Sequence, residues 1–413
     1  MGKHNSFHIL VKPTGPICNL DCDYCYYTKK EAYFPKNHTF RMSDDILESY
    51  IKQYIDSQDT EEIVFSWQGG EPTLIGLDFF RKAVSFQKKY ANGKQITNTI
   101  QTNGTLLTDK WCEFFSEHHF LVGLSLDGPE HIHDQYRIDR GGKPTFELVM
   151  KALSLLKKHQ VEYNILTCVS RYSSYRPLEI YQFFKQQNIQ YIQFIPIVER
   201  KVNEEAKDLS LRNSTPPSIV LEDAHHDVTP WSVEQEMYGE FLIHIFNEWV
   251  RNDVGSIFIM NFEWALASWI GMPSPICIFS EECGRAVVME HNGDLYSCDH
   301  FVYPRFQLGN IKEGLLNLVN SSTQLAFGKK KRDSLPSVCR SCEVRFACHG
   351  ECPKNRFLVS EQHEPGLNYL CASYKKYFKH IDPYMKIMKQ LLQEGLPVSN
   401  VKEIVRDWNE KVI

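Results

Sequence analysis

Short apolar runs alternate with amphipathic stretches through the first half of the chain. The runs have the length and composition of buried strands and fall at residues 7–11, 63–67, 97–101, 121–126, 163–169 and 191–196. Apolar positions at helical spacing lie between them and predict helices at residues 43–57, 77–90, 108–118, 145–159 and 177–187. Ser43 and Thr108 are predicted to cap two of these helices.

Six strand–helix units in succession predict a parallel sheet with right-handed helical crossovers. They are too few for a complete eight-stranded barrel. We therefore expect an α/β fold, a partial (β/α)6 TIM-like barrel followed by a small cysteine-rich domain. A doubly wound open sheet is the alternative.

The second half of the chain loses this periodicity. A charged, proline-containing stretch at residues 201–230 predicts a loop, and an amphipathic helix at 232–253 is expected to bridge the two halves. The cysteine-rich part has little core of its own and is expected to need metal to fold. A helical tail at 374–408 is predicted to break near residues 395–397. The expected divisions are a barrel (1–230), a bridging helical segment (231–270), a cysteine-rich domain (271–380) and a C-terminal helical tail (381–413).

Composition and charge restrict the class of protein. The 413 residues are 42% hydrophobic and 23% charged, which is typical of a folded chain of two or three domains. A net charge of −5 gives no electrostatic reason to expect a nucleic acid or an anionic membrane as a partner. The chain has no long apolar run and no apolar core of a signal peptide near its start. We expect a soluble, cytoplasmic protein.

Cysteine is the informative residue type. The chain has 13 cysteines, an odd number, and eleven of them are clustered, which argues against a secreted disulfide framework and for metal or redox chemistry. Cys112 and Cys168 stand apart and are expected in the core.

The first cluster, Cys18-x3-Cys22-x2-Cys25, follows the first predicted strand. In a parallel barrel this is the C-terminal face, where active sites gather. Three thiolates can hold three irons of a four-iron cube and leave the fourth iron open. A zinc knuckle or a partial ferredoxin run is the alternative.

This spacing, with the aromatic Tyr24 before the third cysteine, resembles the signature of the radical S-adenosylmethionine (SAM) enzymes. The resemblance implies that SAM binds the open iron through its amino and carboxylate groups. It also implies that the reduced cluster splits SAM to give a 5′-deoxyadenosyl radical.

Later strand ends carry motifs that resemble the SAM-binding elements of the same family. Gly69, Gly70 and Glu71 lie after the second strand and resemble the element that binds the amino group of SAM. Ser125 is expected to hydrogen-bond the SAM carboxylate. Arg137 either pairs with that carboxylate or forms a structural salt bridge.

Eight further cysteines suit two four-cysteine sites, for which zinc ribbons are the alternative. Residues 339–356 resemble the SPASM module of radical SAM enzymes that modify peptides, which holds two auxiliary 4Fe–4S clusters. The resemblance implies interleaved ligand sets, in which one cluster is held by Cys277, Cys283, Cys298 and Cys352, and the other by Cys339, Cys342, Cys348 and Cys371. Full ligation by the protein leaves electron transfer or structure as their task.

Asp299 directly follows Cys298. In the anaerobic sulfatase-maturating enzymes, which this chain resembles over nearly its whole length, this position carries the proposed general base. An ordinary turn carboxylate is the alternative. The resemblance implies three 4Fe–4S clusters, SAM as cofactor, a sulfatase polypeptide as substrate, and an electron donor such as a ferredoxin or flavodoxin. The reaction implied is oxidation of a cysteine or serine to Cα-formylglycine.

Two other classes remain open. A thioether-forming peptide maturase would use the same module, although the cysteine loop begins too early in this chain for a preceding leader-binding domain. A non-catalytic iron–sulfur or zinc scaffold is the third class, against which the open three-cysteine site argues. The pairs at 118–119 and 225–226 are expected to be surface histidines, and residues 329–332 a solvated basic loop.

Overall fold

One ten-stranded sheet, ordered β10-β9-β8-β1-β2-β3-β4-β5-β6-β7, organises the molecule. The structure is a computed structural model that describes residues 6–201, 227–406 and 408. The strands that form the barrel are β1 (His8–Lys12), β2 (Glu62–Trp67), β3 (Gln95–Thr102), β4 (Phe120–Ser125), β5 (Tyr163–Val169) and β6 (Tyr191–Pro196). Neighbouring strands from β1 to β6 are parallel.

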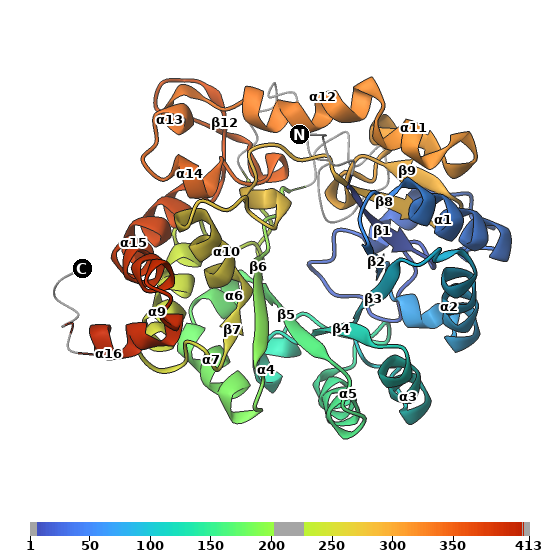
Figure 1. The fold of residues 1–413 in the computed structure, drawn as a ribbon, viewed down its shortest axis with the longest axis horizontal. Helices are drawn as coiled ribbons and strands as arrows, with labels where there is room; N and C mark the ends of the chain where they lie inside the picture. Colours follow the sequence, from blue (N-terminus) through green and yellow to red (C-terminus); the bar gives the residue numbers. More distant parts are fainter. Residues whose placement is uncertain (1–5, 202–226, 407, 409–413) are drawn as a thin grey trace.

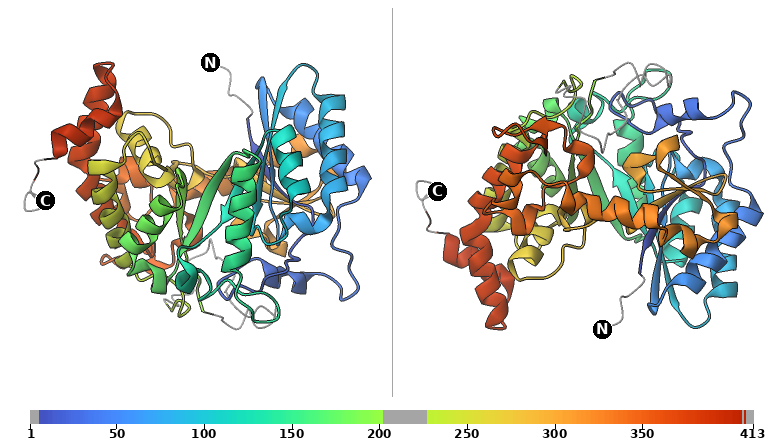
Figure 2. Two further views of the ribbon diagram at one scale, coloured as in Figure 1. Left: turned by 90° about the horizontal axis from the view of Figure 1, so that it is seen from below. Right: turned by 90° about the horizontal axis from the view of Figure 1, so that it is seen from above.

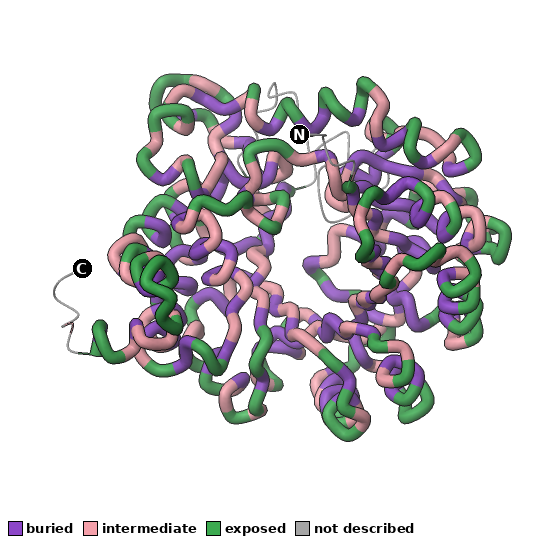
Figure 3. Tube along the Cα trace, in the orientation of Figure 1, coloured by how far each residue is buried: buried purple, intermediate pink, exposed green. Residues whose placement is uncertain are grey.

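Helices cover the outer face of this sheet, and Figure 1 shows them as a ring around the curved strands. The helices that follow the strands are α1 (Asp44–Ser57), α2 (Leu77–Tyr90), α3 (Asp109–Glu117), α5 (Phe146–Lys158) and α7 (Pro177–Gln186), with the short α4 (Glu130–His133) and α6 (Arg171–Ser174) beside them. Buried residues follow the strands and the helix faces turned toward them (Figure 3). The predicted partial (β/α)6 barrel is therefore confirmed, and the doubly wound alternative is not what the chain forms.

The barrel strands alternate between an apolar face and a polar face. In β3, Ile100 is buried against the helices, while Gln101 beside it is half-buried on the other face. Gln101 donates to the Ser125 hydroxyl (Nε2–Oγ 3.0 Å), and Ser66 and Thr99 hydroxyls lie 2.8 Å apart across β2 and β3. The inner face of the sheet is thus lined by polar side chains, as a site for a polar substrate requires.

Both predicted cap residues stand at the N-cap positions of their helices. Ser43 caps α1 by accepting a hydrogen bond from the Ile46 amide (3.3 Å). Thr108 is the N-cap residue of α3 with extended backbone, but its side chain makes no cap hydrogen bond. The first turn of α3 carries Asp109 instead, which suits the positive end of the helix dipole.

The bridging helix α9 (Met237–Asn252) begins five residues later than predicted. The preceding residues are held at the end of β6 instead: the Ser232 hydroxyl accepts from the Glu199 amide (2.9 Å), and the Thr229 amide donates to the Glu199 carbonyl (2.8 Å). After α9 the chain adds β7 (Phe258–Ile259) parallel to β6 and then forms α10 (Met260–Trp269). The sequence pattern did not predict β7. The predicted loop at 201–230 lies largely outside the described residues.

The cysteine-rich part is joined to the barrel through the sheet. Strand β8 (Ala286–Glu290) pairs in parallel with β1, so that His8 lies opposite Ala286 and Lys12 opposite Glu290. Strands β9 (Asp294–Tyr296) and β10 (Gln307–Asn310) then continue the sheet in antiparallel fashion. The predicted domain boundary at residue 271 therefore separates two segments that share one sheet and one hydrophobic core.

Short helices and turns complete the cysteine-rich part. They are α11 (Leu315–Val319), α12 (Ser322–Asp333), α13 (Ser337–Arg340) and α14 (Arg345–Cys348), with the small hairpin β11 (Leu358–Val359) and β12 (Pro365–Leu367). In the view from above, this part lies across the top of the barrel, between its first strand and the C-terminal helices (Figure 2).

The long helix α15 (Cys371–Gln393) packs along α9 (Figure 1). Gly395, with φ +71°, ends the helical stretch, and the chain resumes as α16 (Val401–Val405), so the predicted break is confirmed. None of the helices in the described part of the chain is long and apolar enough to cross a membrane.

Candidate active site

The first cysteine loop leaves the C-terminal end of β1, as predicted. Cys18 and Cys22 are buried, Cys25 is half-buried, and all three are free thiols. Burial raises the pKa of Cys18 to about 12, and the Glu71 carboxylate adds to the rise. The Leu20 amide points at the Cys18 sulfur (3.3 Å). A sulfur that receives an amide donor in a buried loop is suited to iron, which would balance the charge of the thiolate.

The glycine turn after β2 packs directly on this loop. The Gly70 amide donates to the Gly15 carbonyl (2.8 Å), and the Glu71 amide donates to the Ile17 carbonyl (2.8 Å). A Cβ atom on Gly70 would lie 2.1 Å from the Ile17 carbonyl oxygen, so no other residue fits there without moving the loop. Gly69 lies beside it against Gly15.

Glu71 is fully buried, and its carboxylate is held by the chain itself. One oxygen accepts from the Thr73 hydroxyl (2.6 Å), the Thr73 amide (3.0 Å) and the Thr102 hydroxyl (2.7 Å), and the other accepts from the Asn103 amide (2.8 Å). Burial raises the pKa of Glu71, and these hydrogen bonds oppose the rise. The carboxylate therefore joins the ends of β2 and β3. Its expected contact with the amino group of SAM stays a prediction.

Arg137 forms a buried salt bridge rather than standing free. Its guanidinium donates to both oxygens of Asp127, at 2.8 Å (Nε) and 3.1 Å (Nη2). The Tyr24 hydroxyl donates to the same carboxylate (2.6 Å), and the Cys168 amide donates to it as well (2.8 Å). The structural salt bridge considered for Arg137 is therefore present, and its pairing with the SAM carboxylate stays a prediction.

The structure also shows where two further residues of the expected SAM site lie. Tyr24 lies in this network beside the cysteine loop, and Ser125 lies at the end of β4 on the polar inner face. Cys168, expected in the apolar core of β5, instead contacts the first cysteine cluster, and its sulfur lies 3.6 Å from an Arg137 nitrogen.

Asp299 begins a short turn directly after Cys298 and reaches the end of β1 from the cysteine-rich part. Its Oδ1 lies 2.5 Å from the Lys12 ammonium at the end of β1, and its Oδ2 accepts from the Tyr26 hydroxyl. Burial by itself would raise the pKa of Asp299, but Lys12, His300 and the two hydrogen bonds outweigh burial and lower it to about 2. Asp299 is therefore a carboxylate at neutral pH.

Lys12 and Tyr26 both contact the Asp299 carboxylate, and the sequence pattern predicted neither contact. Lys12 is only 1% exposed, and its ammonium also lies over the Tyr27 ring, 4.0 Å from the centroid. The sequence does contain a sign of this role for Lys12. A lysine follows three apolar residues at the end of the strand His8–Lys12, shortly before the cysteine loop. A buried lysine needs a nearby carboxylate, so its presence there points to one in the site.

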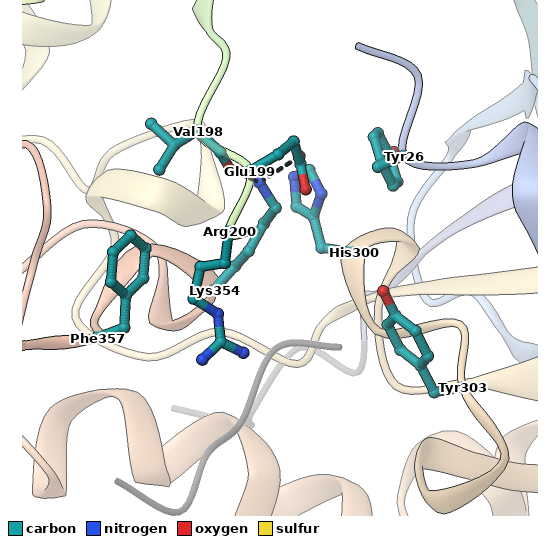
Figure 4. A pocket seen from close by; sticks show the side chains of 8 residues that line it. All are labelled: Tyr26, Val198, Glu199, Arg200, His300, Tyr303, Lys354 and Phe357. Carbon is teal, nitrogen blue, oxygen red and sulfur yellow. Dashed lines mark hydrogen bonds and ion pairs between the residues drawn. The ribbon is translucent and has the colours of Figure 1, made fainter. Parts of the chain in front are cut away.

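A small pocket lies beside Asp299, and Figure 4 shows Tyr26 and His300 facing Glu199 and Lys354 across it. Lys354 forms an ion pair with Glu199 (2.7 Å) and donates to the Val198 carbonyl (2.6 Å). The pocket thus joins the end of β6, the first cysteine loop and the cysteine-rich part. It provides both polar and aromatic groups next to the Asp299 carboxylate.

The eight later cysteines lie in two sets. Burial raises the pKa of Cys298, and the Cys277 and Cys352 thiols add to the rise. Burial raises the pKa of Cys283 to about 11; Lys331 opposes that rise and Cys277 adds to it. These four thiols, Cys277, Cys283, Cys298 and Cys352, are called the inner set below.

The other four thiols form the outer set, Cys339, Cys342, Cys348 and Cys371. Burial raises the pKa of Cys371 to about 11, and the Cys339 and Cys342 thiols add to the rise. Burial raises the pKa of Cys348 to about 12, with a contribution from Cys371. These mutual electrostatic effects support the interleaved ligand sets expected from the sequence, which stay a prediction.

The donor type at these sites suits iron–sulfur clusters. All eleven clustered cysteines are free thiols, and thiolates are the usual ligands of four-iron cubes. Within the described residues, no group of three His, Cys, Asp or Glu side chains is placed to hold a single metal ion.

The basic run at residues 329–332 is not the solvated loop that was expected. It lies in α12, and Lys331 is buried. The Lys331 ammonium donates to the carbonyls of Cys277 (2.6 Å) and Ile278 (2.8 Å). The helix therefore fixes the loop that carries Cys277.

Of the two histidine pairs, residues 225–226 lie outside the described residues, and His118 packs against Phe114 at the end of α3.

A partial barrel with an open three-cysteine loop, joined to two further sets of four cysteines, defines a radical SAM protein with a C-terminal iron–sulfur domain. Comparison with known families agrees: residues 13–182 match the radical SAM superfamily, and residues 277–343 match an iron–sulfur cluster-binding domain.

Individual relatives show which family of radical SAM proteins the chain resembles. The chain is 46% identical to a serine-type anaerobic sulfatase-maturating enzyme of Bacteroides thetaiotaomicron, over 98% of this chain and 96% of that one. It is 32% identical to a cysteine-type enzyme of Clostridium perfringens, over 91% and 96%. A solved structure of native anSMEcpe with bound AdoMet and Kp18Cys peptide matches with a TM-score of 0.79 at 31% identity, covering 93% of this chain and 99% of that chain. The chain belongs to the anaerobic sulfatase-maturating enzymes, which confirms the family expected from the sequence.

Proposed function

We propose that this protein oxidises a serine side chain of a sulfatase polypeptide to Cα-formylglycine. The observation that carries the choice of serine is the identity of 46% to a serine-type relative over 98% of the chain, against 32% to a cysteine-type relative. The sequence alone left serine and cysteine open. The reaction removes two hydrogens from the serine Cβ–OH group and yields the aldehyde directly.

The proposed cofactors are three 4Fe–4S clusters and SAM. Cys18, Cys22 and Cys25 would hold the first cluster, and the inner and outer sets would hold the other two. Support comes from the burial and grouping of the thiols and from AdoMet bound to anSMEcpe. When bound, SAM on the first cluster supplies a 5′-deoxyadenosyl radical able to remove a hydrogen atom from the serine Cβ.

Asp299 is the proposed acceptor of the serine hydroxyl proton. It is ionised and therefore in the accepting form, but a carboxylate with a pKa of about 2 is a weak base. Displacement of Lys12 from the carboxylate by the bound substrate would raise the pKa of Asp299 and make it a stronger base, because Lys12 is the group that lowers this pKa most. Cys298 of the inner set is adjacent in the chain, so the proton and the second electron leave the substrate in the same region.

The proposed partners are the sulfatase polypeptide and a one-electron carrier such as a ferredoxin or flavodoxin. We propose a cytoplasmic location, with neither nucleic acid nor membrane as a partner. The net charge of −5 supports the absence of a nucleic-acid partner.

Mass spectrometry of two matched peptides tests the proposal. Peptides that differ only in serine or cysteine at the target position are incubated with reconstituted enzyme, SAM and dithionite. We expect the serine peptide to lose two hydrogens and gain an aldehyde, at a higher rate than the cysteine peptide. A thioether in either product would instead indicate the rival peptide maturase, and no SAM-dependent product would indicate a non-catalytic scaffold.

A further inference from the structure

The outer cysteine set lies under a part of the surface that is both basic and apolar. Its cysteines are carried by α13, α14 and the start of α15, at the edge of the molecule opposite β2 and β3 (Figure 1). All four are half-buried, so only a thin layer of side chains separates them from solvent.

Three cations lie close to these thiols. Arg340 directly follows Cys339 in α13, and Arg345 in α14 donates from Nη1 to the Arg340 carbonyl (3.2 Å). Lys375 lies one helical turn after Cys371 in α15. Arg345 and Lys375 form no ion pair within the described residues. The nearest carboxylate oxygen to Arg340, on Glu364, is 3.8 Å away and exposed, which makes a weak surface pair. The carboxylate in the same segment, Glu343, is paired with Lys379 (2.6 Å), so the local charge is positive, although the whole chain is negative.

Two apolar side chains lie among these cations. Phe346 is 47% exposed and Val338 is 37% exposed. The Phe346 ring packs edge-on against Trp269, with centroids 4.8 Å apart, so that it is held in place while one side faces solvent. An exposed, fixed aromatic ring with basic neighbours is typical of a surface that binds another protein.

We propose that Val338, Arg340, Arg345, Phe346 and Lys375 form the docking surface for a small acidic protein that carries one electron. The inference rests on the proposed function. In that reaction the substrate loses one electron with the hydrogen atom, and its second electron needs an acceptor. With a cluster in place, the outer set would pass one electron to the oxidised carrier, which would become reduced by one electron, and no atom or proton would be exchanged. The reverse transfer from the reduced carrier follows the same surface.

Charge complementarity decides the kind of partner. Electron-transfer encounters bury little surface and depend on long-range attraction for their rate of association. Arg345 and Lys375, together with the weakly paired Arg340, favour an acidic protein and disfavour a basic one. Phe346, next to Arg345 in the chain, provides an apolar contact. A second copy of this chain would have to present an acidic face.

The test measures binding of an acidic flavodoxin to the reconstituted holoenzyme, without substrate, at low and at moderate salt. The docking variant carries Arg340→Glu, Arg345→Glu and Lys375→Glu. The matched control carries Lys88→Glu, Lys110→Glu and Lys151→Glu, three exposed lysines of α2, α3 and α5 with no ion pair in the described part of the chain. We expect the docking variant to bind at least about tenfold more weakly and to lose most of its salt dependence, while the control binds as the parent does.

Equal weakening in both variants, or none in the docking variant, overturns the proposal. Iron content and the visible spectrum are measured on every sample, because charge reversal near the outer set can disturb the cluster. If iron is lost, the same comparison is made with Phe346→Ser. Weaker binding of this variant at full iron content supports the proposal, and unchanged binding overturns it. Formylglycine formation by the parent enzyme with dithionite is measured separately, so failure of the proposed function is distinguished from failure of the docking surface.

Discussion

Asp299 is held by groups from the opposite end of the chain. Lys12 ends β1 and Tyr26 follows the first cysteine loop, while Asp299 belongs to the cysteine-rich part. The ion pair with Lys12 is nearly enclosed, with exposed side-chain fractions of 1% and 13%. A buried pair of this kind fixes the position of the carboxylate more than it stabilises the fold.

Replacement of Asp299 by asparagine tests its role in proton transfer. Asp299→Asn keeps the size of the side chain but removes its ability to accept a proton, so formylglycine formation should fall by about 10²–10⁴-fold. Cleavage of SAM to 5′-deoxyadenosine should persist, and iron content should not change. Both products are measured in the same reaction by liquid chromatography. Loss of iron would make Asp299 a structural residue, and a normal rate would assign the base elsewhere.

The Lys12 pair is tested by a double-mutant cycle. Lys12→Met leaves the Asp299 charge buried without its partner and should lower the free energy of unfolding by about 3–5 kcal/mol. The double variant Lys12→Met with Asp299→Asn buries no unpaired charge and should recover a large part of that loss. Urea unfolding of the four proteins measures the cycle. Additive losses would mean that the two residues do not interact.

A buried histidine makes the barrel sensitive to acid. His133 accepts from the Asp127 amide through Nδ1 (3.3 Å), and burial lowers the pKa of His133 to about 3. The unfolded chain, with a histidine pKa near 6.5, binds more protons below that pH, so stability falls as the pH decreases from about 6.5 toward 3. At pH 5 the loss is about 2 kcal/mol. His133→Asn keeps an acceptor without the charge, and its unfolding midpoint in circular dichroism should move to lower pH. An unchanged midpoint would contradict this account.

At the scale of helices and strands, local patterns predicted the elements well. Strands β5 and β6 have the predicted boundaries because their apolar positions are bounded by clear turn residues. The pairing of β8 with β1 was not predictable, since it joins segments at opposite ends of the chain and leaves no local signal. The same reason hid the contact of Lys331 with the Cys277 loop. The spacing of the cysteines can be read from the sequence alone and predicted the site. The contacts of Asp299 with Lys12 and Tyr26 depend on the fold and could not be predicted in this way.

The turn after β2 provides a test at this scale. Gly70→Ala places a methyl group 2.1 Å from the Ile17 carbonyl and should push the first cysteine loop away from the turn. We expect loss of about a third of the iron, because one cluster of three would be affected. Gly141→Ala is the control, as its nearest contact is the flexible Asp139 side chain at 3.2 Å. Equal iron in both variants, measured by a colorimetric iron assay, would show that the loop tolerates the added methyl group.

The whole molecule is expected to hold roughly twelve irons in three clusters. Replacing Cys18, Cys22 and Cys25 by alanine should remove about a third of them and abolish 5′-deoxyadenosine formation, while Cys112→Ala should retain all. Iron and zinc are measured on protein prepared without oxygen. Stoichiometric zinc with little iron would contradict the cluster assignment, and 5′-deoxyadenosine from the triple variant would move the catalytic cluster elsewhere.

The pairing of β1 with β8 has a consequence for how the protein is made. β1 leaves the ribosome before the barrel is complete, and its neighbour at residues Ala286–Glu290 emerges only after all barrel strands have been synthesised. Until then one edge of β1 is unpaired, and the loop that follows it lacks the segment that carries Asp299. We therefore expect iron delivery to the first loop to follow the emergence of β8, when both edges of β1 are covered.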